Sequence, residues 1–307
     1  MDIGVKAAYN ACMNLFNEEI AKRIESQGIC VEREVSARTL TTFGSGGFVH
    51  YVAYPVSVEQ TLTFIEMAQG YRYHVVGAGS NLVISDYGLG CVLCLKRLKG
   101  YRFEGETLIA SAGEFLPMLS KAAYEKGLSG LEFACGIPGT LGGALSMNAG
   151  AFGGELSQIT EEIVLYKNGE VKKTTPKALG MRYRDGRLSG AVVLSATLRL
   201  TPKEKEAIRS TMEANTAARE KSQPKEQSAG CVFKRLNGVN PAVYVQGCGL
   251  KGVRIGGAAV SGKHCNFIVN LGGAESRDYL RLTERVKDKV RERYGVELEE
   301  EVVFLRD

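Results

Sequence analysis

The chain has 307 residues, of which 44% are hydrophobic and 24% charged, and its formal net charge is +5. This composition is typical of a globular protein large enough for more than one core, and it excludes disordered and collagen-like chains. The positive charges are spread along the sequence, which favours anionic small ligands over a nucleic-acid duplex. No apolar run reaches the ~18 residues that a membrane helix needs.

The N-terminal segment lacks the basic region and apolar core of a signal peptide. Residues 5–27 carry apolar side chains at helical spacing, so we expect an amphipathic helix that ends near Gly28. The eight cysteines are scattered in apolar surroundings, which indicates buried thiols in a reducing, cytoplasmic compartment. Cys91 and Cys94 form a lone CxxC inside the apolar run CVLCL, which we interpret as strand core, and we expect no metal site.

The first hundred residues alternate strands, helices and glycine turns. An extended segment begins at Cys30, a glycine turn follows at 41–47, and a strand then leads into a helix that Gly70 closes. Residues 71–86 indicate two short strands joined by the turn GAGSN. This turn resembles a dinucleotide fingerprint only superficially, because Leu82 stands where the third glycine belongs and a strand follows it.

The most distinctive segment is GIPGTLGGALSMNAGAFGGE at 136–155, which contains seven glycines. Glycine lets a ligand approach the backbone closely, and successive exposed N–H groups attract anions. Pro138 and the interleaved apolar residues indicate a shaped loop that is anchored in a core. We interpret this loop and the GAGSN turn as two sides of a cradle for a cofactor diphosphate; a tight structural turn is the alternative.

The rest of the chain gives clear signals for individual elements. The dipeptide Asn168-Gly169 predicts a hairpin. A charged helix is expected at 203–218, and the breaker-rich segment 221–230 is the best domain boundary. A strand-like CVFKR follows, then a helix at 277–295 with an apolar face, and a last strand entered through four glutamates.

Six segments occur in an order and spacing that resemble one enzyme family. They are VVGAGSNLVISD, SGLEFACGIPGTLGGALSMNAGAFGGE, YRD, SAGCVFK, GLKGVRIGGAAVSGKHCNFIVN and LEEEV. They resemble the UDP-N-acetylenolpyruvoylglucosamine reductases, which are FAD enzymes of peptidoglycan precursor synthesis, over roughly residues 35–305. The short connection from Arg184 to Cys231 resembles the second, short-loop type of this family.

The resemblance implies an α+β protein. Two FAD-binding subdomains of the vanillyl-alcohol-oxidase-like (PCMH) type would be followed by a smaller α+β substrate domain. The implied boundaries are an N-terminal helical segment at 1–34, subdomains at 35–98 and 99–218, and a substrate domain at 219–307 whose last strand returns to the active site. The implied activity is that of an NADPH-dependent flavoprotein reductase. Hydride passes from NADPH to non-covalent FAD and then to the enolpyruvyl double bond, which is protonated. The expected partners are a UDP sugar and NADPH, with no nucleic acid, membrane or obligate protein partner.

The cofactor residues that the two loops and the resemblance imply lie in two clusters. They are Gly77, Ala78, Gly79, Ser80, Asn81, Gly136, Ile137, Pro138, Gly139, Thr140, Gly142, Gly143, Ala144, Asn148, Ala149 and Gly150.

Three residues match the catalytic positions of the family. Arg184 of YRD matches its arginine, and Glu301 of LEEEV matches its glutamate, although Glu300 stands where relatives have proline. Negative charge develops toward the substrate carboxylate during the reduction, so a bidentate guanidinium suits that position. The alternatives are a surface turn with a local Arg184–Asp185 ion pair, and a solvated acidic run around Glu301.

Cys231 stands where the family has its proton-donating serine. A thiol, with an ordinary pKa near ~8.5, is a better acid than an alkyl hydroxyl, and it donates a proton only below its pKa. We therefore expect the second hydride transfer to slow as the pH rises through that pKa. The alternative is a small buried core cysteine.

Four residues are expected to bind the substrate: Tyr183, Lys221, Lys234 and Arg235. The three basic residues flank the Cys231 motif and suit the UDP diphosphate, and the alternative is that each is solvated. Many relatives carry a basic residue at the Gly44 position, so this chain lacks that contact.

Three other functions remain open from the sequence. One is a flavin oxidase of the same cofactor fold with another substrate, which leaves SAGCVFK and the C-terminal part unexplained. Another is a cysteine hydrolase that pairs Cys231 with His264, but its nucleophile would need a helix N-terminus or a sharp turn. The third is a nucleotide-binding protein that has lost turnover through the change at Cys231.

Overall fold

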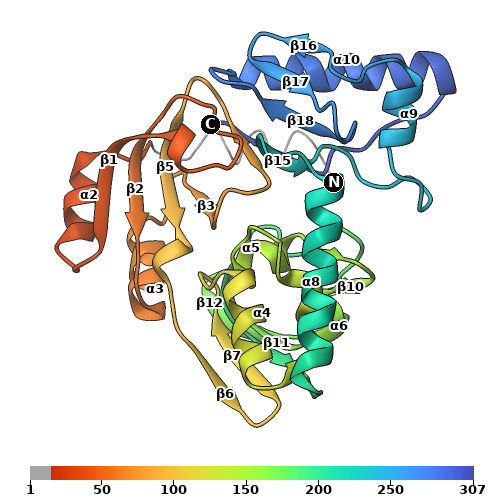
Figure 1. The fold of residues 1–307 in the computed structure, drawn as a ribbon. Helices are drawn as coiled ribbons and strands as arrows, with labels where there is room; N and C mark the ends of the chain where they lie inside the picture. The colour runs from red at the N-terminus through yellow and green to blue at the C-terminus, as the bar shows by residue number, and fades with distance from the viewer. Residues whose placement is uncertain (1–14) are drawn as a thin grey trace.

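The computed structural model describes residues 15–307, which form three α+β units (Figure 1). The helices are α2 (Glu18–Glu25), α3 (Val58–Met67), α4 (Leu116–Glu125), α5 (Leu141–Ser146), α6 (Leu156–Ile159), α7 (Pro176–Leu179), α8 (Lys205–Ser222), α9 (Ala242–Gly247) and α10 (Ser276–Tyr294), with 3₁₀ turns η1 (Ala37–Thr39), η2 (Leu95–Arg97) and η3 (Glu132–Ala134). The strands are β1 (Cys30–Ser36), β2 (Phe48–Tyr54), β3 (His74–Val76), β4 (Leu82–Ile84), β5 (Leu89–Cys94), β6 (Tyr101–Glu104), β7 (Thr107–Ser111), β8 (Leu128–Ser129), β9 (Gly150–Ala151), β10 (Gly154–Glu155), β11 (Thr160–Lys167), β12 (Glu170–Thr174), β13 (Val192–Arg199), β14 (Thr201–Pro202), β15 (Gln227–Cys231), β16 (Arg254–Ile255), β17 (Ala258–Val260), β18 (Phe267–Asn270) and β19 (Val303–Leu305). Within the described range, no helix has the length and apolar character needed to cross a membrane.

The first unit is a mixed sheet in the order β1-β2-β5-β3, drawn in red and orange in Figure 1. β1 pairs antiparallel with β2, while β5 pairs parallel with both β2 and β3. The parallel pairing of β2 with β5 needs a crossover, and the connection between these two strands contains α3, β3 and β4. The predicted strand core at the CxxC is confirmed, because Cys91 and Cys94 lie buried on β5.

The helix predicted at 5–27 is wrong in part. Residues 5–14 lie outside the described residues, and α2 begins only at Glu18. Asn17 has an extended backbone, and its side chain accepts hydrogen bonds from Glu19 N and Ile20 N. Asparagine competes with the helix backbone in this way, so it starts a helix here instead of continuing one.

The second unit is an antiparallel sheet in the order β12-β11-β13-β7-β6, with α5 packed on β13 and α4 packed against α8. The predicted hairpin joins β11 to β12, and its central residues Asn168 and Gly169 both have positive φ, at 54° and 87°. That conformation matches the twist of the two strands. The first two units share one large core of buried residues.

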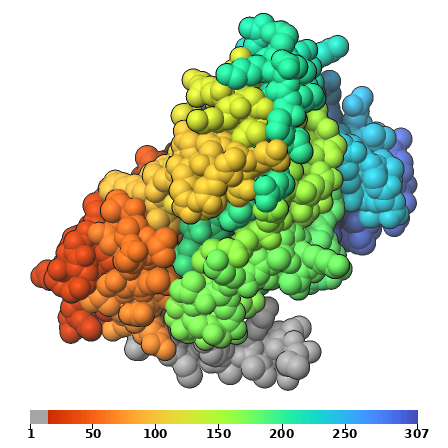
Figure 2. Space-filling view, turned by 90° about the horizontal axis from the view of Figure 1, so that it is seen from below, coloured from red at the N-terminus to blue at the C-terminus, as the bar shows by residue number. Residues whose placement is uncertain are grey.

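The third unit is the antiparallel sheet β15-β18-β17-β16, against which α10 packs. The predicted apolar face of α10 is confirmed, because Leu282, Val286 and Val290 are buried, and the helix ends at the left-handed Gly295. The helix α9 had no clear signal in the sequence. Figure 2 shows the first and third units on opposite sides of the second.

The last strand returns to the first unit, where β19 pairs parallel with β4. Figure 1 accordingly marks the C-terminus beside the red and orange unit. The core of the third unit also includes Phe43 and Val83, two residues from the first hundred. These contacts bind the C-terminal segment to β4, the strand that leads out of the GAGSN turn.

Three smaller expectations need correction. The charged helix α8 runs to Ser222, four residues beyond its expected end at 218, because Lys221 and Ser222 continue it before Gln223 becomes extended. The strand expected to contain CVFKR is β15, which ends at Cys231. Finally, of the seven cysteines in the described part, Cys91, Cys94 and Cys265 are buried, Cys135, Cys231 and Cys248 are partly buried, and Cys30 is exposed.

Candidate active site

The GAGSN turn connects β3 to β4 and is wedged between two other segments. A Cβ atom on Gly77 would lie 2.2 Å from Thr140 Oγ1, and one on Gly79 would lie 1.9 Å from Leu40 O. Gly79 also has a φ of +66°, and its carbonyl accepts a hydrogen bond from Thr42 N at 3.2 Å. The turn therefore requires glycine at both positions and has no room to shift.

The second glycine segment is more regular than the sequence predicts. Instead of a loop throughout, it contains the short helix α5, which Thr140 caps through its buried hydroxyl. Gly142 packs closely, since a Cβ there would lie 2.9 Å from Ala112 Cβ. Thr140 touches the Gly77 position, and a Cβ on Gly139 would lie 3.6 Å from Ser80 Oγ, so the two glycine segments do face each other as expected.

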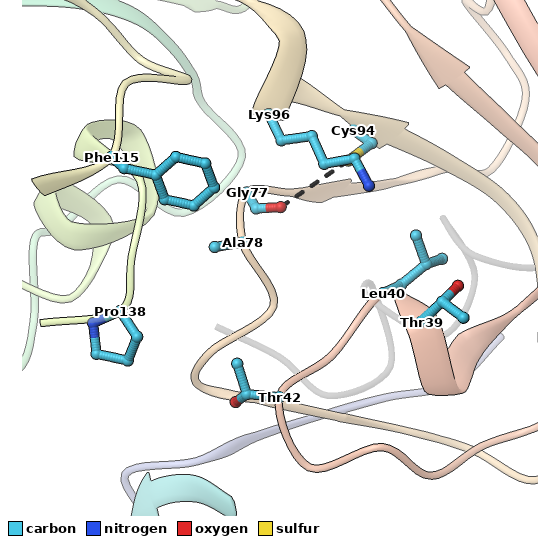
Figure 3. Close-up of a pocket in the computed structure, with 9 residues that line it drawn as sticks. All are labelled: Thr39, Leu40, Thr42, Gly77, Ala78, Cys94, Lys96, Phe115 and Pro138. Carbon is cyan, nitrogen blue, oxygen red and sulfur yellow. Dashed lines mark hydrogen bonds between the residues drawn. The ribbon is translucent and has the colours of Figure 1, made fainter. Parts of the chain in front are cut away.

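A pocket of about 390 Å³ opens beside both segments (Figure 3). Gly77 and Ala78 form its floor, Leu40 lies on one side, and Phe115 and Pro138 lie on the other. The backbone N–H groups of the turn residues 78–80 donate to no acceptor within residues 15–307. A concave site with free N–H groups and no room for a Cβ fits the diphosphate of a dinucleotide such as FAD. The sequence did not mark Leu40, Lys96 or Phe115, because no local pattern shows that they reach this pocket.

Arg184 lies on a tight turn with a φ of 54°. Arg182 and Asp185 close the turn with two backbone hydrogen bonds, and the buried Asn148 side chain donates to Arg182 O at 3.0 Å. The guanidinium reaches inward: Nε lies 2.8 Å from Glu301 Oε1, and the NH2 group donates to Gly150 O at 2.9 Å. This geometry excludes the alternative of a surface ion pair with Asp185, whose carboxylate pairs with Arg187.

The side chain of Glu301 lies in a different environment from those of the adjacent Glu299 and Glu300. Its side chain is only 14% exposed, whereas Glu299 pairs with Lys234 and Glu300 with Lys287 at the surface. Burial raises the pKa of the Glu301 carboxyl above its ordinary value, and the nearby charges of Arg184 and Lys234 oppose that rise. The sequence left the register of the glutamates open, and the fold places Glu301 opposite Arg184.

Cys231 lies at the end of β15, opposite Phe267 of β18. Burial raises the pKa of its thiol to about 12, and repulsion by the Glu301 carboxylate adds to the rise. Arg184, Arg235 and Arg219 lower that pKa by attraction, so all three cations lie within electrostatic reach of the sulfur. The three residues expected to be catalytic are thus brought together from three distant parts of the chain.

Arg219 is a residue that the sequence reasoning missed. It lies in the last turn of α8, and its guanidinium lies 5.5 Å from the Phe152 ring centre. Its NH1 group donates to Gln223 Oε1 at 3.3 Å, whereas its buried Nε atom has no hydrogen-bond partner within residues 15–307. A Cβ on Gly136 would lie 2.6 Å from its Cδ, so the glycine there makes room for this side chain. Burial lowers the pKa of Arg219. A partly buried cation that forms no ion pair with the described residues suits an anionic ligand.

Two residues expected to bind substrate are in contact with each other. Tyr183 Oη accepts a hydrogen bond from Arg235 N at 3.4 Å, and the Arg184 guanidinium lies 4.9 Å from the Tyr183 ring centre. Lys234 sits 2.6 Å from Glu299 and still acts on Glu301 through its charge. Lys221 is exposed on α8 and forms no ion pair within the described residues.

Comparison with known proteins agrees with this geometry. A family model described as an FAD binding domain matches residues 49–175, so the fold and site define an FAD-dependent oxidoreductase. A second model, the C-terminal domain of UDP-N-acetylenolpyruvoylglucosamine reductase, matches residues 223–305. Proteins of that name are similar to this chain: one from Rubrobacter xylanophilus is 41% identical over 86% of this chain and 92% of its own length. One from Listeria monocytogenes is 43% identical over 85% of this chain and 90% of its own length.

A solved structure is also similar. The UDP-N-acetylenolpyruvylglucosamine reductase of Thermus caldophilus superposes with a TM-score of 0.80 at 36% identity, covering 91% of this chain and all of that one. The chain belongs to the UDP-N-acetylenolpyruvoylglucosamine reductase family. It therefore has the α+β architecture that the sequence predicted, with an FAD-binding part followed by the C-terminal domain of this family.

Proposed function

We propose that the protein reduces the enolpyruvyl group of UDP-N-acetylglucosamine-enolpyruvate to UDP-N-acetylmuramate, with NADPH as the hydride source, in peptidoglycan precursor synthesis. The observation that carries this proposal is the largely shielded Arg184–Glu301 pair at 2.8 Å, with side chains 20% and 14% exposed, within electrostatic reach of the Cys231 thiol. A carboxylate-bearing enol ether needs a cation, a proton donor and a closed site, and these residues provide them.

We propose that FAD is held by the cradle between the two glycine segments. Its residues would be the turn Gly77–Asn81 and the segment from Gly136 to Gly150, whose N–H groups and close packing fit a diphosphate. When bound, FAD supplies the relay that takes a hydride from NADPH and delivers it to the substrate. The residues of the protein then bind and orient the substrate, exclude water and supply the proton.

The chain's own residues have separate roles in this proposal. Arg184 binds the substrate carboxylate and neutralises the negative charge that develops there after the hydride adds to the outer carbon. Glu301 fixes the guanidinium of Arg184 in place. Cys231 gives its proton to the inner carbon, and the thiolate that remains takes a proton back from solvent. One hydride and one proton thus convert the double bond to a single bond.

Substrate contacts outside this centre follow from the same arrangement. We propose that Tyr183, Lys234 and Arg235 bind the UDP part, because they surround Arg184 and add positive charge on that side. We further propose that Lys221 contributes to this binding from the last turn of α8. We also propose that 35–98 and 99–218 are the cofactor subdomains and 219–307 the substrate domain, and that the enzyme works in the cytoplasm, where NADPH and UDP sugars occur.

The rival functions fit the site less well. A cysteine hydrolase needs a thiolate nucleophile, but burial keeps the Cys231 thiol protonated, with a pKa of about 12. A flavin oxidase with another substrate leaves the match of residues 223–305 without a purpose. A protein that binds the nucleotide without turnover has the same fold, and only an assay separates it from the reductase.

The test is an absorbance scan followed by two mixing experiments. The purified protein is expected to be yellow and to release free flavin on denaturation. NADPH is expected to bleach the flavin, and UDP-N-acetylglucosamine-enolpyruvate is expected to restore its colour. A colourless protein that takes up no FAD would contradict the cofactor assignment. Flavin that NADPH reduces but the sugar does not reoxidise would support the non-catalytic alternative.

A further inference from the structure

Asn81, the last residue of the GAGSN turn, makes two hydrogen bonds to the C-terminal segment. Its side-chain Nδ2 donates to Glu301 O at 2.9 Å, and its backbone carbonyl accepts from Val303 N at 3.0 Å. On the other side, Glu301 N donates to Val232 O at 2.7 Å. The main chain at Glu301 is therefore held between the GAGSN turn and Val232, the residue that follows Cys231.

The turn that carries Asn81 is itself closely packed. Gly77 and Gly79 each pack against another segment at distances that exclude a Cβ, and Thr42 N is bonded to Gly79 O. β4 begins at the next residue, Leu82, which pairs with Val303 of β19. A fixed turn at one end and a paired strand at the other make Asn81 a rigid reference point for Glu301.

We propose that Asn81 is a positioning residue that fixes the position of Glu301 relative to the GAGSN turn. A glutamate side chain has three rotatable bonds, so its 2.8 Å contact with Arg184 depends on a well-fixed main chain. The Asn81 Nδ2 donor is already engaged with Glu301 O, so a contact of this residue with FAD would have to come from its other atoms. This inference rests on the proposed function, since it takes Glu301 to act in the second hydride transfer.

Two variants separate this role from general stability. Asn81→Asp keeps the shape of the side chain but replaces the N–H donor with an oxygen, which then faces the Glu301 carbonyl. Asn81→Ser is the second variant, because it is smaller and uncharged. The control is Asp307→Asn, which loosens the far end of the same segment, where Asp307 accepts from Gly90 N and contacts His74 at 3.0 Å.

The two half-reactions are measured by rapid mixing, each enzyme being loaded with excess FAD and its flavin content determined. Both Asn81 variants are expected to slow reoxidation by the UDP-enolpyruvyl sugar by roughly ten- to a hundredfold, the scale of a small misplacement of a catalytic group. Reduction by NADPH is expected to stay within about twofold in the same variants. Asp307→Asn is expected to keep both rates.

A double-mutant cycle and a structural readout complete the test. If Asn81 acts through Glu301, adding Asn81→Asp to Glu301→Gln slows reoxidation no further. In the FAD-free protein, hydrogen exchange of the peptide that contains Val303 is expected to be faster in the Asn81 variants than in the parent.

The outcomes distinguish this inference from the proposed function. If Glu301→Gln leaves reoxidation unchanged, the role proposed for Glu301 fails. If Glu301→Gln slows reoxidation but the Asn81 variants do not, or if the two effects multiply, the positioning role is wrong. If both Asn81 variants fail to bind FAD, Asn81 serves the cofactor and the inference is overturned.

Discussion

At the scale of single residues, the structure differs most from the sequence expectation in the pKa values of the site residues Cys231 and Glu301. The motifs identify Arg184, Cys231 and Glu301, but the raised pKa values of Cys231 and Glu301 arise from burial, which only tertiary packing creates. The thiol is the clearest case. Its raised pKa, about 12, moves the expected alkaline fall in activity out of the working range. Arg219 was missed for a similar reason, because a charged residue near a helix end looks solvated in sequence.

The pH dependence of the second hydride transfer tests the state of Cys231. Cys231 carries its proton at pH values below its pKa. Because burial raises that pKa to about 12, the thiol stays protonated at neutral and mildly alkaline pH. Reoxidation by the UDP-enolpyruvyl sugar is therefore expected to be flat between about pH 7 and pH 10, where an ordinary cysteine titrates. A fall centred near the ordinary thiol pKa would show that Cys231 is solvated.

Substitution of Cys231 tests its role directly. Cys231→Ser keeps a proton donor at this position and is expected to retain substantial reoxidation, while Cys231→Ala is expected to lose at least about 10²-fold. Reduction by NADPH is expected to change little in both, because no proton from this position is needed there. Wild-type turnover in Cys231→Ala would mean that the proton comes from elsewhere.

Arg219 is expected to bind an anionic part of the substrate. Its buried Nε has no partner in the described chain, so removing the charge with Arg219→Gln should weaken substrate binding by at least about tenfold. Binding is measured by the change in flavin absorbance when the sugar is added to the oxidised protein. The control is Arg209→Gln, an exposed arginine of the same helix paired with Glu206. Equal effects of the two changes would assign Arg219 a structural role only.

At the scale of elements, the sequence predicted a turn or a helix end correctly wherever a single residue type determines the local backbone conformation. Asn168-Gly169 fixed a hairpin, and Gly295 ended α10 where expected. The errors occur where two outcomes compete locally. Asn17 fits both a helix interior and a cap, and Lys221 and Ser222 fit both a helix end and a loop. The meeting of the two glycine segments followed from chemistry. The helix α5 inside one of them was missed in spite of its N-cap Thr140, because two of its six residues are glycines, which disfavour a helix interior.

The GAGSN turn offers a test of the cofactor cradle. Gly79→Ala places a Cβ 1.9 Å from Leu40 O in a backbone conformation that disfavours side chains, so the turn must move away from the pocket. The affinity for FAD is expected to fall by at least about tenfold, which quenching of flavin fluorescence measures. Gly262→Ala is the matched control, because a Cβ there meets nothing within 4 Å and φ is not positive. Unchanged FAD affinity in Gly79→Ala would place the cofactor elsewhere.

At the scale of the whole molecule, the third unit is fastened to the first. Phe43 is fully buried in the core of the third unit and packs edge-on to Tyr279, with ring centres 5.1 Å apart. Asn270 donates to Phe43 O at 2.9 Å, and the Asp86 carboxylate accepts from Ser276 N and Arg277 N at the start of α10. No sequence pattern predicts these contacts, since they join residues roughly two hundred positions apart.

This fastening predicts that the two units unfold together. Phe43→Ala is expected to lower the free energy of unfolding by about 3–5 kcal/mol, the cost of removing a buried ring. Phe48→Ala, at a site that is 56% exposed, is expected to cost about 0.5 kcal/mol or less. Urea unfolding followed by circular dichroism measures both values. A Phe43→Ala protein as stable as the Phe48 variant would contradict the shared core.

The parallel pairing of β19 with β4 has a consequence for how the protein is made. Ribosomes build chains from the N-terminus, so the segment that carries Glu301 and Val303 is made long after its partner β4. The cradle for FAD is encoded entirely upstream of it. A nascent or prematurely terminated chain that stops short of Glu301 therefore contains every residue of the cradle but lacks the carboxylate that faces Arg184. Under the proposed function, the active site is therefore complete only once the segment with Glu301 and β19 has been made.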